Sequence, residues 1–268
     1  MKILEHFIGG KENNPDTCED GLIMKEDLIA VIDGVTAKGT HLWNGKKSGC
    51  HAKNVLLDYL NQDIVELSAI ELLENLNQVL KNEIEKCEEN LSYVEYPRAV
   101  TIIYNDLHKE IWCYGDCQCS INGAVYTHSK KLDELNSDLR AFVLEYEIAC
   151  GKTIQDLKEK DLGREAIQNN LLMQFMFENR KGYFGYPVLN GMGIETSMLK
   201  IYPVRKGDEV VLASDGYPIL KKTLGESEEE LDHILLHDPM CFSMYRATKG
   251  IETGNVSFDD RTFCRFLV

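Results

Sequence analysis

The chain has 268 residues, 44% of them hydrophobic, and a formal net charge of -15. This length fits one large domain or two small ones, and the hydrophobic share supports a packed core. The negative charge argues against nucleic-acid binding, which requires a cationic surface that neutralises phosphates.

The start of the chain, MKILEHFIGG, is too short and too polar for a signal peptide and is typical of a first strand. No uninterrupted apolar run reaches the roughly 18 residues of a membrane-spanning helix. The nine cysteines lack the CxxC-like spacing of a zinc site, and their odd number fits a reducing cytoplasm. The sequence therefore predicts a cytoplasmic protein without a membrane segment.

The first third of the chain predicts strands followed by helices. Residues 23–33 resemble a hairpin whose tip lies near 25–27. Apolar residues at helical spacing then predict two amphipathic helices, over roughly 46–62 and 67–90.

Strands return between residues 98 and 128. Asn122-Gly123 between two apolar runs is a strong hairpin signal. Within these strands, we expect Cys113, Cys117 and Cys119 to fill core positions and not to bind a metal.

Residues 129–195 differ from the rest because they predict helices. The sequence TIQD at 153–156 resembles a capping box between two of them. An apolar stripe in the last helix predicts packing against its neighbours; it consists of Leu171, Leu172, Phe175 and Met176. Strands at 197–204 and 208–213, a helix near 226–237 and a closing strand at 262–268 complete the pattern.

The order of strands, helices and strands predicts an α+β fold with antiparallel sheets and not alternating βαβ units. No repeat, low-complexity segment or linker interrupts the chain. We therefore expect a single domain over residues 1–268 that contains a helical insertion at 129–195.

Four acidic clusters are spread over almost the whole chain, and three of them stand at the edge of a short apolar run. Carboxylates at the ends of core strands are costly unless something pairs with them. Several that arrive from distant segments predict a shared Mg²⁺ or Mn²⁺ ion, since these cations prefer oxygen ligands. Four unrelated turns are the alternative, because Asp-Gly is a common turn dipeptide. The clusters are Glu19-Asp20, Asp33-Gly34, Asp215-Gly216 and Asp259-Asp260.

In this order and context the clusters resemble those of the metal-dependent protein phosphatases of the 2C type, the PPM family, in a divergent, bacterial-like form. The resemblance covers residues 1–128 and 196–268, and it implies a four-layer αββα sandwich of two antiparallel sheets flanked by helices. The segments that carry it are CEDG at 18–21, VIDGVTAKG at 31–39, YGDCQCSINGAVY at 114–126, GDEVVLASDGYPIL at 207–220 and SFDDRTFCRFLV at 257–268.

The resemblance also implies a centre with two Mg²⁺ or Mn²⁺ ions. Asp33 would bridge both ions, and Asp215 and Asp259 would hold one of them. These three residues would be catalytic through a metal-bound water, which two cations about 4 Å apart can deprotonate at neutral pH. The implied metal ligands are Glu19 and Asp20 (mostly through water), Asp33, Gly34 (through its carbonyl), Asp215 and Asp259.

The chain departs from the family pattern at several positions. Asp116 matches the first of two aspartates that hold an additional metal in relatives, but the second falls on Ile219, which cannot bind a metal. Pro15 stands where many relatives have a phosphate-binding arginine. Lys11 is the nearest upstream cation and a weak substitute, because a lysine is a point charge and not a bidentate fork.

Other arginines could therefore complete a phosphate site. The candidates are Arg98, Arg180 and Arg246.

The leading hypothesis is a metal-dependent phosphomonoesterase that hydrolyses phosphoserine or phosphothreonine in a phosphoprotein substrate and acts in signalling. Two alternatives stay open. One is a phosphatase-like regulatory or scaffold module with a degraded site. The other is a two-metal hydrolase of a small phosphorylated metabolite, since surface loops set specificity. The retained Asp33, Asp215 and Asp259 favour an enzyme, because unpaired buried carboxylates would burden a metal-free fold.

Overall fold

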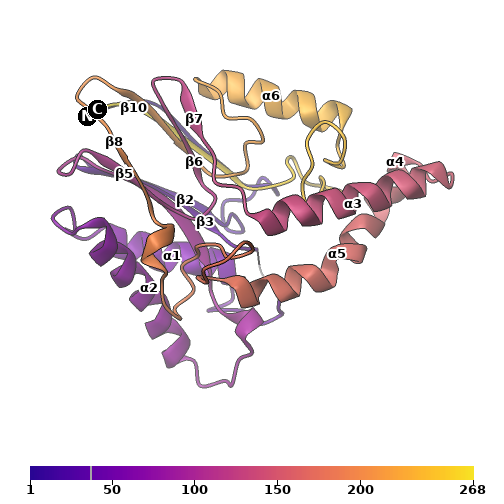
Figure 1. Cartoon of the computed structure of the whole chain (residues 1–268), viewed down its shortest axis with the longest axis horizontal. Helices are drawn as coiled ribbons and strands as arrows, with labels where there is room; N and C mark the ends of the chain where they lie inside the picture. Colours follow the sequence, from indigo (N-terminus) through magenta and orange to yellow (C-terminus); the bar gives the residue numbers. More distant parts are fainter. Residues whose placement is uncertain (37) are drawn as a thin grey trace.

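Two five-stranded antiparallel sheets form the centre of the molecule (Figure 1). The computed structural model describes residues 1–36 and 38–268, so Ala37 of the segment 31–39 lies outside the described residues. One sheet has the order β1 (Lys2–Gly9), β10 (Arg261–Leu267), β9 (Glu209–Ala213), β6 (Gln118–Ile121) and β7 (Ala124–Tyr126). The other has the order β2 (Asp20–Met24), β3 (Leu28–Gly34), β4 (Ala99–Asn105), β5 (Glu110–Tyr114) and β8 (Lys200–Pro203).

The sheets pack face to face through one apolar layer. Strand β3 is buried on both of its faces, which accounts for its continuous apolar sequence. Ile29 and Val31 point into the layer between the sheets, where they share a cluster with Leu212 of β9. Ala30 and Ile32 point to the opposite face, toward the helices. A strand buried on both faces shows no apolar–polar alternation, because both sets of side chains leave water.

Helices cover both outer faces and complete the predicted four layers (Figure 1). Helices α1 (Ser48–Leu60) and α2 (Ala69–Lys86) pack on the sheet that contains β3. Helix α6 (Leu224–His237) lies along the other sheet. The predicted α+β sandwich is therefore confirmed, and both long helices are slightly shorter than their apolar spacing indicated.

Two local predictions are confirmed at the level of backbone geometry. Asn122 and Gly123 join β6 to β7 with φ angles of 51° and 87°, as a tight two-residue hairpin requires. Residues 25–27 form the turn of the β2–β3 hairpin. The three clustered cysteines, Cys113, Cys117 and Cys119, are buried in the layer between the sheets.

Between β7 and β8 the chain forms α3 (Lys131–Ala149), α4 (Ile154–Glu159) and α5 (Leu162–Met173). Short 3₁₀ turns are η1 (Tyr93–Glu95), η2 (Gln174–Phe177) and η3 (Thr196–Met198). Thr153 and Asp156 form the predicted capping box at the start of α4. No helix among the described residues is long and apolar enough to cross a membrane.

Helices α3 and α5 pack side by side (Figure 1). At Gly163 a Cβ atom would lie 2.8 Å from the carbonyl oxygen of Arg140, so only glycine permits this close approach. The predicted apolar stripe is half wrong. Leu171 and Phe175 are buried, whereas Leu172 and Met176 are exposed, because the helix is covered on one side only.

Candidate metal centre

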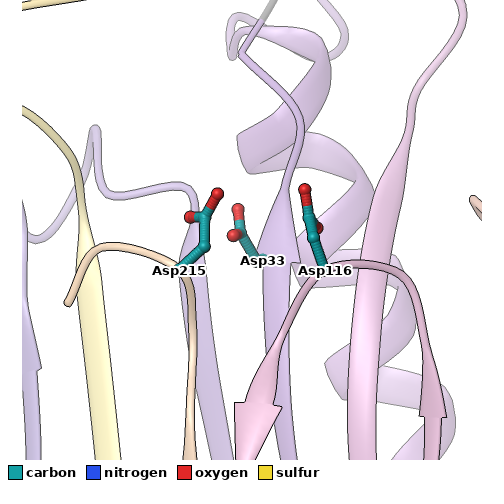
Figure 2. A group of neighbouring side chains, drawn as sticks. All are labelled: Asp33, Asp116 and Asp215. Atoms are coloured by element: carbon teal, nitrogen blue, oxygen red, sulfur yellow. The ribbon is translucent and has the colours of Figure 1, made fainter. Parts of the chain in front are cut away.

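Three aspartates from both sheets converge at one edge of the sandwich (Figure 2). Asp33 is the penultimate residue of β3, Asp116 lies in the turn between β5 and β6, and Asp215 lies two residues after the end of β9. One carboxylate oxygen of each lies within 4.8 Å of the others. The group joins the ends of strands from the two sheets, as the prediction of a shared cation requires for Asp33 and Asp215.

The glycines that follow two of these aspartates are required by close packing. At Gly34 a Cβ atom would lie 2.3 Å from the carbonyl oxygen of Gly49, and at Gly216 it would lie 2.0 Å from that of Asp260. The Asp-Gly pairs are therefore points where another backbone segment crosses the strand end. Asp33-Gly34 and Asp215-Gly216 are therefore not isolated surface turns.

The carboxylates are held away from water and close to each other, so their pKa values are high. Burial raises the pKa of Asp215 to about 7, and Asp116 and Asp259 add to the shift. Burial also raises the pKa of Asp33, with Asp215 as the next cause. Ionisation of these buried carboxyl groups costs free energy, and a bound cation would offset that cost.

Glu19 and Asp20 lie next to the cluster from the β2 side. Asp20 pairs with Asp33 in the β2–β3 register, and burial raises the pKa of Asp20 to about 8. Oε1 of Glu19 and Oδ2 of Asp20 are buried and accept no hydrogen bond from any described residue. Buried oxygens of this kind usually bind water or an ion, which fits the role implied for both residues.

Asp259 stands apart from the triad in one respect. It lines the same cavity as Asp33 and Asp215, but its own oxygens contact Lys249 at 2.6 Å and Lys11 at 3.6 Å. Burial would raise its pKa, yet the two lysines lower it overall. Asp259 is thus ionised and paired, and its role as a metal ligand stays a prediction.

Lys11 is held by the acidic groups behind the cluster. Its ammonium lies 3.0 Å from Glu19, 3.1 Å from Asp260 and 3.6 Å from Asp259. Asp260 also accepts backbone N–H groups from Lys11 at 2.7 Å and Glu19 at 3.0 Å, which fixes the loop between β1 and β2. The lysine therefore neutralises carboxylates, and its proposed contact with substrate stays a prediction.

The donor set fits a hard divalent cation. Mg²⁺–oxygen bonds of about 2.1 Å place opposite ligands roughly 4.2 Å apart, close to the separation within the triad. Asp33, Asp116 and Asp215 offer only oxygen atoms, as Mg²⁺ and Mn²⁺ prefer. Asp116, expected only as a ligand of an additional metal, is therefore part of the central group.

Of the other arginines that we considered for the phosphate, Arg98 and Arg246 have partners outside the triad. Arg98 is buried and contacts Glu178 at 2.7 Å. Arg180 lines a separate cavity that contains none of the site carboxylates. Arg246 pairs with Asp138 at 2.7 Å, and it also lines a larger cavity that Asp116 and Asp215 share.

Four other cations do line the cavity of the carboxylates, and sequence reasoning missed all of them. Lys130, Arg164 and Lys249 come from segments outside every motif, and Lys38 lies within the segment 31–39 but at a position to which the resemblance assigned no role. Lys130 contacts Asp116 at 2.6 Å and therefore offsets part of the charge of the triad. The four cations are Lys38, Lys130, Arg164 and Lys249.

No protein-family model matches this chain, and no curated protein does either. Solved structures do match it. The serine/threonine phosphatase PstP/Ppp of Mycobacterium tuberculosis has a TM-score of 0.50 at 14% identity, over 99% of this chain and 98% of that one. The catalytic domain of the serine threonine protein phosphatase PstP, in complex with two manganese ions, has a TM-score of 0.51 at 15% identity, over 100% of both chains. The chain therefore has the fold of the PPM serine/threonine phosphatases.

Proposed function

We propose that this protein is a Mg²⁺- or Mn²⁺-dependent phosphatase that hydrolyses phosphoserine or phosphothreonine in proteins. The observation that carries the proposal is the convergence of Asp33, Asp116 and Asp215 from both sheets. It occurs in a fold shared with a phosphatase that was solved with two manganese ions.

Each acidic residue has a defined task in this proposal. Asp33 lies between the carboxylates of the two sheets and would bridge two ions, while Asp215 and Asp259 would hold one of them. Bound ions would supply an activated water and would offset charge on the phosphoryl group. Glu19 and Asp20 keep buried oxygens free to accept hydrogen bonds from water.

The surroundings of the carboxylates favour a protein substrate over a small metabolite. Beside the cavity of about 120 Å³ that contains Asp33 lies a second one of about 350 Å³. Asp116, Asp215 and Asp259 line both. Side chains next to a phosphorylated residue could occupy the larger cavity. A cytoplasmic location and a role in signalling are part of the same proposal.

Turnover of p-nitrophenyl phosphate and of a phosphothreonine peptide tests the function, each with Mn²⁺, Mg²⁺ or EDTA. We expect metal-dependent hydrolysis of both that EDTA abolishes. Asp33→Ala should be inactive, whereas Asp58→Ala, at an exposed position of α1, should behave as wild type. A protein that binds Mn²⁺ but hydrolyses neither substrate would support a scaffold. Hydrolysis of the aryl phosphate without the peptide would favour a metabolite hydrolase.

A further inference from the structure

Two cations beside the centre have no acidic partner, although the chain carries a net charge of -15. Lys38 and Arg164 form no ion pair with any residue of 1–36 and 38–268, whereas Lys11, Lys130 and Lys249 all do. The Lys38 ammonium donates to the carbonyl of Thr36 at 3.2 Å. Nη1 of Arg164 donates to the carbonyl of Thr248 at 2.7 Å.

Both side chains line the same cavity as Asp33 and Asp215. Arg164 reaches it from the first turn of α5, and Lys38 reaches it from the loop that follows β3. Since the two segments are far apart in sequence, the fold itself brings the cations together next to the candidate metal ligands.

The position of Arg164 is fixed by its surroundings. Its backbone N–H donates to the side chain of Asp161, the N-cap of α5, at 2.7 Å. The close approach at Gly163 holds this end of α5 against α3. With Nη1 on the Thr248 carbonyl, Nε and Nη2 have no hydrogen-bond acceptor within the described chain, so they are available to a ligand.

The two cations disfavour each other's charge. Burial, together with the charges of Arg164 and Lys249, lowers the pKa of Lys38 to about 7. Burial also lowers the pKa of Arg164, with Arg140 as the next cause. Glu19 and Asp259 oppose the effect on Lys38 without cancelling it. Neither Lys38 nor Arg164 therefore has a contacting carboxylate, among the described residues, that offsets its charge.

We propose that Arg164 and Lys38 bind the phosphoryl oxygens of the substrate, and of the phosphate that is released, across the cavity from the metal-binding carboxylates. Arg164 has a planar fork that can donate two hydrogen bonds to one phosphate. The pair would thus take the place of the arginine that many relatives carry at the position of Pro15. The inference rests on the proposed function for the identity of the substrate, but binding of phosphate can be measured without turnover.

The test uses Arg164→Gln and Lys38→Met in the full chain. Glutamine keeps an amide donor for the Thr248 carbonyl and removes the charge, and methionine keeps most of the length of the lysine. Arg205→Gln is the matched control, because Arg205 is exposed beyond the far end of β8. Calorimetry measures the affinity for Mn²⁺ and, with Mn²⁺ present, the affinity for inorganic phosphate.

We expect each site variant to bind phosphate at least about tenfold more weakly, since a charge-assisted contact is lost. KM for p-nitrophenyl phosphate should rise by a similar factor, while the affinity for Mn²⁺ should not fall, because neither cation contacts a carboxylate. The Arg205 variant should match wild type. Unchanged phosphate affinity in both site variants overturns the inference.

The two proposals fail in different ways. If wild type hydrolyses phosphopeptides and both site variants keep its KM and phosphate affinity, the phosphatase stands and the inference is wrong. If wild type binds phosphate through Arg164 and Lys38 without any turnover, the inference stands and the enzymatic function is wrong. A wild-type protein that contains Mn²⁺ and binds no phosphate overturns the inference as well.

Discussion

Asp215→Asn should stabilise the metal-free protein, even though it removes a predicted metal ligand. In the folded chain the pKa of Asp215 is about 7, against an ordinary value of 3.8. The folded state therefore binds more protons than the unfolded state between about pH 4 and pH 7. Stability falls as pH rises through this window, and the full cost is present above pH 7.

A difference of about three pKa units corresponds to roughly 4 kcal/mol, which is the most that Asp215 can cost the folded state at pH 8. At pH 5 the raised pKa lowers the free energy of unfolding by less than about 2 kcal/mol, because Asp215 is still protonated in the folded state. Asparagine keeps the shape and removes the charge. Since Asp33 and Asp116 share the repulsion, we expect the variant to be more stable than wild type by roughly 1–4 kcal/mol at pH 8.

Urea unfolding in EDTA at pH 5, 6, 7 and 8 measures the free energy of unfolding of both proteins. His51 and His128, whose pKa values are lowered by burial, affect both proteins equally and cancel in the comparison. Asp58→Asn serves as the control for loss of an exposed carboxylate. Saturating Mn²⁺ should reverse the order, because the metal stabilises the protein that binds it more tightly. A variant that is less stable than wild type at pH 8 without metal, or a difference that does not change with pH, would refute the reasoning.

Three further variants separate the roles of neighbouring groups. Asp33→Ala should lose metal-dependent turnover and keep a wild-type circular dichroism spectrum; full turnover or an unfolded protein would contradict this. Lys11→Met should destabilise the metal-free protein by about 3–5 kcal/mol, because it leaves the buried carboxylates of Glu19 and Asp260 without a cation. Urea unfolding measures this loss, and Mn²⁺ should restore part of it. Pro15→Arg should leave KM for p-nitrophenyl phosphate within about twofold of the wild-type value, because Arg164 and Lys38 would already hold the phosphoryl oxygens; a drop of about tenfold would indicate that the phosphate site lacks a charge-assisted contact.

Much of the fold could be predicted because its signals are local. The run that includes Ile29 and Val31 is apolar on both faces, and Asn122-Gly123 satisfies the positive φ angles of a tight turn. The error at Met176 has a physical cause as well. An apolar periodicity tells which face of a helix is apolar, but it does not tell how much of that face a neighbouring element covers.

The candidate site could be predicted only in part. The acidic positions stood out because a charge at the end of a core strand is unusual, and Asp33 and Asp215 are indeed brought together. The partner of Asp259 could not be foreseen, because Lys249 reaches it from a loop without regular structure. Arg164 lies on a helix surface, where an arginine is ordinary until the fold turns it toward a cavity.

The carboxylates of the centre are neutralised in two different ways, one for the triad and one for Asp259. This explains how the protein can fold without metal. In the triad, Lys130 offsets the charge of Asp116, and the raised pKa values of Asp33 and Asp215 favour their protonated, neutral forms. One divalent cation would replace those protons and match the remaining charge. On the other side, Lys11 and Lys249 already neutralise Asp259. If a second cation binds at Asp259 as predicted, it must compete there with the ammonium groups of Lys11 and Lys249, so we expect it to bind more weakly than the first.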